Sequence, residues 1–168
     1  MGVFPKALDF AQRAIEINEA LAEPHASRAY AISRSQWQWK EAEDEYQRSI
    51  ELDDSYPTSH QWYAEHLTAM GRFDEARVKI QKAQVLDPQS PIVSTAVGTV
   101  AYFARNVDEA IEQYLQTIKK HPRFARVRLR LARAYAQKGM FTHAIRECRQ
   151  GLRNSSARQT EMVQLGQV

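Results

Sequence analysis

Small residues recur at fixed positions along this chain, among apolar residues that repeat with the period of a helix. One column holds Ala42, Ala76, Ala110 and Ala144, at equal intervals of about 34 residues. Further columns keep the same register: Ala29, Ala64, Gly98 and Ala132; Ser49, Ala83, Thr117 and Gly151; and the bulkier Tyr46, Ile80, Tyr114 and Cys148. A shared period across several columns predicts a repeated pair of stacked helices.

The clearest unit lies at residues 91–122. Ser90 suits the N-cap of a helix and Pro91 suits its first position. Asn106 is a second N-cap, and Pro122 ends the helix that follows it. The stretch therefore predicts one helix, a tight turn and a second helix.

Applied to the whole chain, this unit predicts an all-α single domain. The expected segments are a half repeat with only its second helix at 6–20, repeats at 22–56, 57–90, 91–124 and 125–155, and a tail or capping helix at 156–168. The tail has two readings, because Met162, Val163 and Leu165 either cover the last face or begin a fifth repeat. The unpaired first helix favours a fragment of a longer protein, since terminal repeats normally carry a polar cap.

The turn around residues 35–39 differs from the later ones. The interval from Ala29 to Ala42 is longer by one position than the corresponding intervals of the later pairs, such as Ala64 to Ala76. No glycine stands there, unlike Gly71 and Gly139 in later turns. Trp39 shares a column with other apolar residues and is expected to be buried, which leaves Trp37 exposed.

A period of about 34 residues, with small residues on paired helices, resembles the tetratricopeptide repeat (TPR) family. The resemblance covers residues 6–153 and includes the terminal prolines Pro88 and Pro122. It implies a right-handed α-solenoid. Three segments are also similar to TPR regions at the C-terminal end of bacterial signalling and transcriptional regulators, and imply a sensory or scaffolding role: HQWYAEHLTAMGRFDEA, VAYFARNVDEAIEQY and LARAYAQKGMFTHAI.

Composition narrows the class of protein. A hydrophobic content of 43% over 168 residues predicts a folded chain. No apolar run approaches the roughly 20 residues of a membrane span, and the start lacks the pattern of a signal peptide. We expect a cytoplasmic protein, or a periplasmic one if the parent protein is anchored in a membrane. The single cysteine excludes an internal disulfide.

Charge is unevenly distributed. Residues 1–90 hold 10 Lys/Arg and 15 Asp/Glu, a net charge of −5, while residues 91–168 hold 13 and 5, a net charge of +8. This asymmetry predicts a field along a solenoid axis.

The sequence shows no catalytic, cofactor-binding or metal-binding motif. Cys148 falls in a core column and is expected to be a small core residue. The carboxylates Glu41, Glu43, Asp44 and Glu45 are expected to form a solvated helix face. We therefore predict that the chain is not an enzyme and needs no cofactor.

The TPR resemblance implies a concave groove lined by the first helix of each repeat, which holds a peptide or partner helix. The groove residues that it implies are Tyr30, Gln61, Glu65, Thr95, Thr99, Tyr102, Phe103, Arg126, Arg130 and Arg133. The three arginines are spaced i, i+4, i+7 and share one helical face. The leading prediction is a protein-interaction module whose partner is a protein or peptide, with acidic character at the basic end.

Two alternatives stay open. Copies with an acidic start and a basic end could self-associate head to tail. Nucleic-acid binding through the basic fourth repeat is less favoured, because its aromatic residues Phe124, Tyr135 and Phe141 fall in core columns, whereas a stacking platform needs exposed rings. For the arginines themselves, the simpler reading is a solvated face that a carboxylate such as Glu65 partly neutralises.

Overall fold

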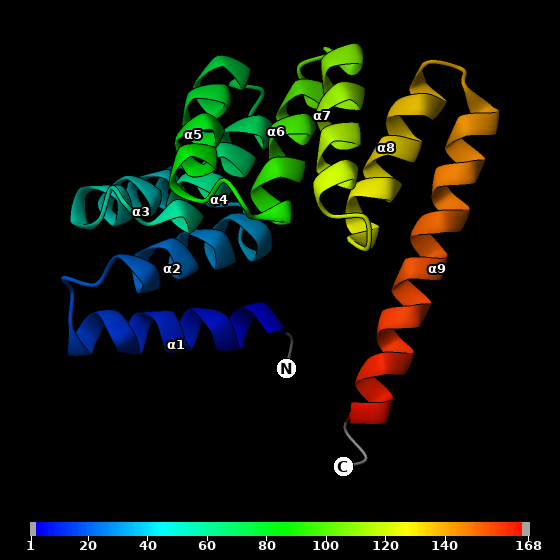
Figure 1. Ribbon diagram of the computed structural model, residues 1–168. Helices are drawn as coiled ribbons and strands as arrows, with labels where there is room; N and C mark the ends of the chain where they lie inside the picture. The colour runs from blue at the N-terminus through cyan, green and yellow to red at the C-terminus, as the bar shows by residue number, and fades with distance from the viewer. Residues whose placement is uncertain (1–2, 166–168) are drawn as a thin grey trace. The chain divides into compact units, whose positions relative to one another are not determined.

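The computed structural model describes residues 3–165, with side chains at residues 4–155. This part of the chain folds into nine helices and contains no strand, which confirms the predicted all-α fold. The helices are α1 (Val3–Ile17), α2 (Ala22–Ser35), α3 (Trp39–Leu52), α4 (Pro57–Ala69), α5 (Phe73–Leu86), α6 (Pro91–Phe103), α7 (Val107–Lys120), α8 (Ala125–Gln137) and α9 (Phe141–Leu165) (Figure 1).

The helices form two compact units. Unit 1 is residues 1–88 and contains α1 to α5; unit 2 is residues 89–168 and contains α6 to α9. In unit 1, α2 pairs with α3 and α4 with α5, while α1 packs on α2. In unit 2, α6 pairs with α7 and α8 with α9. The helix pairs are those that the sequence predicts, and the finer repeat boundaries stay a prediction.

The small-residue columns lie where helices approach most closely. Ala42, Ala76 and Ala110 have no exposed surface. Gly98 is tighter still, because a Cβ atom at this position would lie 2.6 Å from Cε1 of Tyr114. Close packing of this kind leaves no room for a larger side chain.

The turn inside each helix pair contains one residue in the left-handed region. These residues are Trp37, Gly71, Arg105 and Gly139, with φ of 58°, 77°, 68° and 73°, and they recur at the same interval as the alanine columns. A left-handed residue commonly ends a helix because it turns the backbone away from the axis. The turn geometry therefore repeats even where the residue is not glycine.

Hydrogen bonds hold three of these turns in a Schellman motif. At Gly71, the Arg72 N–H donates to the Leu67 carbonyl at 2.9 Å, and the Gly71 N–H donates to the Thr68 carbonyl at 3.1 Å. The turns at Arg105 and Gly139 carry the same two bonds. The Trp37 turn follows α2, which has 14 residues where α4, α6 and α8 have 13. The extra residue, expected around residues 35–39, thus lengthens α2 itself, because Trp37 follows the end of α2 at the same spacing as Gly71 follows the end of α4.

Trp37 is 70% exposed, as predicted. Trp39 is only half-buried, and its ring centroid lies 5.6 Å from that of His66.

Helix α9 differs from its prediction, because it continues without a break from Phe141 to Leu165 instead of ending at Arg153. The side chains of Met162, Val163 and Leu165 lie outside those that the structure describes, so both readings of the tail stay predictions. Cys148 is exposed, so its assignment to the core is wrong. In the same column, Tyr46 stacks on Tyr63 of α4 with ring centroids 5.5 Å apart, whereas no described helix packs over Cys148.

Candidate partner-binding faces

The first helices of unit 1 bring three of the predicted groove residues together. The Tyr30 ring packs on Trp62 of α4 with centroids 4.6 Å apart, and the Arg34 guanidinium lies 5.1 Å from the Tyr30 centroid. Arg34 Nη2 is 3.0 Å from Glu65 Oε2, and Gln61 Nε2 donates to Glu65 Oε1 at 3.1 Å. Glu65 is thus paired within unit 1, and this face is electrically balanced.

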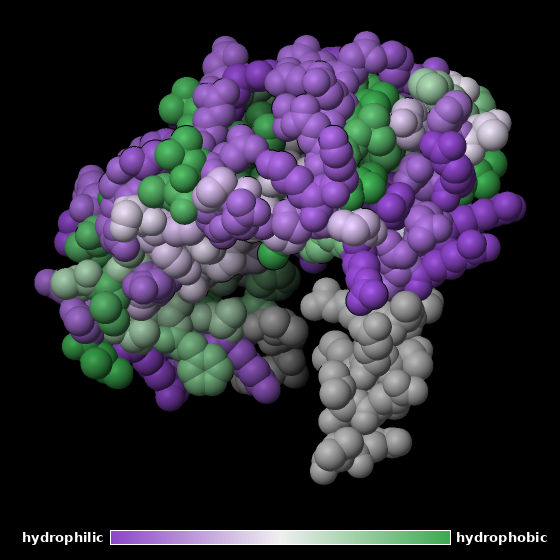
Figure 2. Space-filling view, in the orientation of Figure 1, coloured by the Kyte–Doolittle hydropathy of each residue, from purple (hydrophilic) through white to green (hydrophobic). Residues whose placement is uncertain are grey.

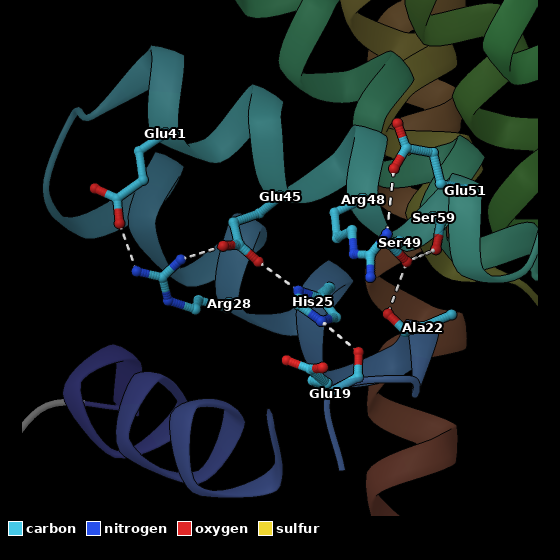
Figure 3. Close-up of polar contacts among 10 residues, drawn as sticks. All are labelled: Glu19, Ala22, His25, Arg28, Glu41, Glu45, Arg48, Ser49, Glu51 and Ser59. Atoms are coloured by element: carbon cyan, nitrogen blue, oxygen red, sulfur yellow. Dashed lines mark hydrogen bonds and ion pairs between the residues drawn. The ribbon is translucent and has the colours of Figure 1, made fainter. Parts of the chain in front are cut away.

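A network of ionic contacts crosses from α2 to α3 in the same unit (Figure 3). His25 Nδ1 lies 2.7 Å from Glu45 Oε2, and His25 Nε2 lies 3.2 Å from the Glu19 carbonyl oxygen. Arg28 donates to Glu45 and also to Glu41, at 2.5 Å for the latter. The side chain of Glu45 is only 19% exposed. These contacts fix α2 against α3.

The prediction of a solvated acidic face on α3 is therefore wrong for two of its residues. Besides Glu45, Glu43 is only 16% exposed and lies 2.7 Å from Arg72 Nη1. The Tyr63 hydroxyl also donates to Glu43 at 2.7 Å. The pKa of Glu43 is lowered although its burial acts in the opposite direction, because Tyr63 and Arg72 stabilise the carboxylate. The physical reason is that α3 packs between α2 and α4, so its carboxylates meet partners from both neighbours.

Unit 2 contains an ion pair at the position of the His25–Glu45 contact. Arg128 Nη1 lies 2.7 Å from Glu147 Oε2, and the two side chains are 15% and 9% exposed. With the one-residue shift of α2 taken into account, Arg128 stands three repeats after His25 and Glu147 three repeats after Glu45. A sequence comparison by residue type misses this correspondence, because an imidazole and a guanidinium fill the same place.

Helix α4 carries two buried histidines. Burial lowers the pKa of both His60 and His66 below 6.5, because desolvation penalises the charged ring. His66 is in ring contact with Trp39, Tyr46 and Tyr63. Neither of its ring nitrogens has a hydrogen-bond partner in the described part of the chain. The surroundings of His66 therefore favour its neutral form.

In unit 2, two of the predicted groove residues of α6 use their hydroxyls within the protein, and of these Thr95 is buried and Thr99 half-buried. Thr95 is 4% exposed, and its hydroxyl donates to the Pro91 carbonyl at 2.7 Å. The Thr99 hydroxyl donates to the Thr95 carbonyl at 2.9 Å and accepts from the Tyr114 hydroxyl at 3.3 Å. Both threonines thus support the face from within α6 rather than presenting a free hydroxyl to a ligand.

The other two α6 residues form an aromatic corner. Tyr102 and Phe103 meet edge to face with centroids 5.5 Å apart, and Phe103 is 43% exposed. The Arg133 guanidinium of α8 lies 5.9 Å from the Tyr102 centroid, within reach of a cation–π interaction. The structure therefore brings the predicted residues of α6 and α8 into contact.

Three arginines follow this corner along α8. Arg126 and Arg133 are exposed and Arg130 is half-buried. None of the three forms an ion pair with a carboxylate among residues 4–155, and α8 itself contains no Asp or Glu. Glu65, considered above as a counter-charge, is already bound to Arg34. The α6–α8 face, which we define as Tyr102, Phe103, Arg126, Arg130 and Arg133, thus combines exposed apolar surface with unneutralised positive charge.

The described part of the chain was also searched for metal-binding clusters and for membrane-spanning helices. Among the residues with described positions, no group of three or more His, Cys, Asp or Glu side chains is arranged to hold a metal ion. Nor does any described helix combine the length and the apolar character needed to span a bilayer.

Comparison with known proteins identifies the fold. Residues 96–158 match the family model described as "Tetratricopeptide repeat". A search of curated proteins gave no match. Among solved structures, TTC0263, described as a thermophilic TPR protein of Thermus thermophilus, has a TM-score of 0.83 at 16% identity over 98% of this chain and 89% of that one.

Two more solved structures have a similar fold. MamA has a TM-score of 0.71 at 18% identity, covering 94% of this chain and 91% of that one. YrrB, described as a TPR protein with an unusual peptide-binding site, has a TM-score of 0.64 at 20% identity, covering 86% and 74%. The chain therefore has the fold of TPR proteins, and residues 96–158 carry the sequence pattern of that family.

Proposed function

We propose that this chain is a non-catalytic protein-interaction module that binds an acidic segment with apolar residues on the α6–α8 face. The observation that carries the proposal is the row of three arginines without a described acidic partner, joined through the Arg133–Tyr102 contact to the aromatic corner with its exposed Phe103. The TPR fold supports a scaffold role in general, and the described peptide-binding site of YrrB supports a peptide as ligand. The three segments similar to bacterial regulators support a place within a larger bacterial regulatory protein.

The chemistry of the face fits such a ligand. Each guanidinium can bind a carboxylate through two parallel hydrogen bonds. Arg126 and Arg133 lie two turns apart, which is about 10 Å along a helix. An extended peptide covers that distance in roughly three residues. Two carboxylates close together in the ligand can therefore reach the arginine row.

The aromatic corner supplies the apolar part of the contact. Phe103 is accessible, and Tyr102 is held between Phe103 and Arg133. A leucine or aromatic side chain next to the acidic residues would bury surface here at about 25 cal/mol per Å². The ligand is thus expected to need both charge and apolar area, and an all-polar acidic peptide should bind more weakly.

The test is a titration of labelled peptides that contain Asp or Glu beside Leu or Phe, followed by fluorescence anisotropy. The triple variant Arg126→Ser, Arg130→Ser and Arg133→Ser should bind about tenfold more weakly or worse and lose most of its salt dependence. Peptides with Asn and Gln in place of the acids should bind the wild type as weakly.

A matched control removes the same number of positive charges elsewhere in unit 2. The exposed residues Lys119, Lys120 and Arg123 serve this purpose, changed together to serine. This control should bind like the wild type, and circular dichroism should show unchanged helicity in both variants. Equal binding by the two triple variants would show that the arginine row is only a solvated face.

A further inference from the structure

The outer face of α9 carries two parallel rows of side chains. The first row is apolar, with Phe141, Ile145 and Leu152 exposed by 64%, 52% and 62%, and with exposed Cys148 between them. The second row is basic and consists of Arg146, Arg149 and Arg153, all exposed. Successive members of each row are three or four positions apart, which is the spacing of a single helix face. We call these seven residues the α9 stripe.

In the other repeats, the positions of the apolar row are buried or half-buried, whereas those of the basic row are exposed, as at Asp44, Val78 and Glu112. The residues of the Cys148 column in α3 and α7, Tyr46 and Tyr114, are each 1% exposed and pack against the first helix that follows them. In α9, by contrast, Phe141, Ile145 and Cys148 are exposed. An apolar row of this length beside arginines indicates an interaction surface rather than scattered exposed residues.

Unit 1 contains a pocket of about 560 Å³ between α1, α2 and the start of α3. Its apolar residues are Pro5, Leu8 and Ile32. Its carboxylates are Asp9 and Glu41, with side chains 53% and 42% exposed, and Asp9 lies 3.2 Å from Arg13 on the same helix. Arg28 also lines the pocket, but it is bonded to Glu41 and Glu45. In Figure 2, green and pale atoms interrupt the purple surface over α1 and α2. We call this the α1–α3 pocket.

We propose that the α9 stripe of one copy binds in the α1–α3 pocket of a second copy. An arginine of the stripe would lie between Asp9 and Glu41, with its aliphatic stem and Ile145 over Leu8. The choice of occupant rests on charge complementarity, because the unit that holds the pocket has a net charge of −5 and the unit that holds the stripe has +8. Opposite net charges of this size favour encounter between copies in this orientation.

The contact is heterologous, since it joins two different surfaces. Each bound pair therefore keeps one free stripe and one free pocket, and the assembly can extend into a chain of copies. The α6–α8 face takes no part, so this proposal goes beyond the proposed function, and either can fail without the other.

The test is sedimentation equilibrium of the whole chain, with reductant present because Cys148 is exposed. The stripe variant carries Arg146→Glu and Arg149→Glu. The pocket variant carries Asp9→Lys and Gln12→Lys, both at exposed positions of α1 that leave Arg28 and Glu41 untouched. A control variant with Lys119→Glu and Lys120→Glu changes the net charge by the same amount as the stripe variant.

The wild type and the control should gain mass with concentration, and more so at low salt. The stripe and pocket variants should each associate about tenfold more weakly or worse. Mixed together they should recover wild-type affinity, because one supplies an intact pocket and the other an intact stripe. The mixture should stop at a dimer of one copy of each, since the remaining surfaces are both blocked.

Several results would overturn the proposal. A wild type that stays monomeric at every concentration and salt would do so, as would a mixture of the two variants that fails to form a dimer. Continued self-association of the pocket variant would show that two α9 helices pair symmetrically instead. If vesicles of phosphatidylglycerol bind a monomeric wild type but not the stripe variant, the stripe serves a membrane surface and the proposal is wrong.

Discussion

Replacing Gly98 by alanine tests the packing logic of the repeats most directly. Gly98 lies in the middle of α6, and its new Cβ atom would stand 2.6 Å from Cε1 and 2.8 Å from Cδ1 of Tyr114. Real Cβ contacts of that length do not persist, so the Tyr114 ring has to move. That ring is 1% exposed and its hydroxyl is bonded to Thr99, so it has little room to do so.

Two terms decide the magnitude. Overpacking a well-packed core costs about 1–3 kcal/mol. Alanine is favoured over glycine inside a helix by about 1 kcal/mol. The net expectation for Gly98→Ala is a loss of about 1 kcal/mol in the free energy of unfolding. For a unit of this size, such a loss lowers the melting temperature by about 4–8 °C.

Gly151→Ala is the matched control, because it is the same substitution in another helix of unit 2. Its nearest neighbour is Cδ2 of Leu129 at 3.2 Å, and Leu129 is 41% exposed and free to yield. This variant should gain part of the helix-propensity term and be more stable than Gly98→Ala by about 1–2 kcal/mol. Urea unfolding followed by circular dichroism measures both variants.

A second substitution removes the Tyr114 ring that the new Cβ atom would meet. Tyr114→Ile combined with Gly98→Ala reproduces the pair Ala64 and Ile80, which occupies the same position in unit 1 with 0% and 1% exposure. In this background Gly98→Ala should lose its cost, which a double-mutant cycle measures as a coupling energy. If Gly98→Ala proves as stable as Gly151→Ala, or costs the same in the Tyr114→Ile background, the close contact does not constrain this position.

Three other changes probe separate features. Arg105→Gly should raise the free energy of unfolding by up to about 1 kcal/mol, because glycine adopts the φ of 68° without strain; urea unfolding that shows a loss would contradict this. Glu147→Gln should lower the free energy of unfolding by about 3 kcal/mol, because this substitution leaves the nearly buried Arg128 without its counter-charge. The control is Glu112→Gln at an exposed position, measured in the same assay. Because the pKa of His66 is lowered in the folded chain, the unfolded chain takes up a proton at this histidine at a higher pH than the folded chain does. The stability that depends on neutral His66 is therefore full above pH 6.5 and falls as the pH drops below 6.5. His66→Val should reduce this acid loss, and an unchanged pH profile would exclude His66 as its source.

The fold was predictable from sequence because small residues at a fixed period have few alternatives to close helix contacts. Ala76 and Ala110 are fully buried, as their column predicts. The same logic failed for Cys148, because a column states which face of a helix a residue occupies but not whether another helix covers that face. Nor does a column show how a hydroxyl is used: those of Thr95 and Thr99, which the TPR resemblance places in the groove, bond to carbonyls of their own helix.

The polar contacts were harder to predict. Glu45 lies among other acids on α3, and its periodicity is that of a surface residue. Its burial depends on His25 and Arg28, which come from another helix and are not close to it in sequence. The arginine row of α8, in contrast, was visible in the spacing alone, because its members belong to one helix and no acid interrupts it.

The His25–Glu45 and Arg128–Glu147 contacts each join the two helices of a single pair. Neither depends on a residue from the preceding or the following pair for its charge balance. A gene duplication or deletion of whole repeats therefore copies or removes donor and acceptor together. An array can therefore lengthen or shorten during evolution without stranding these two pairs of charges. The contacts between successive pairs, such as Tyr46 with Tyr63 and Glu43 with Arg72, are the ones that must be remade at each new junction.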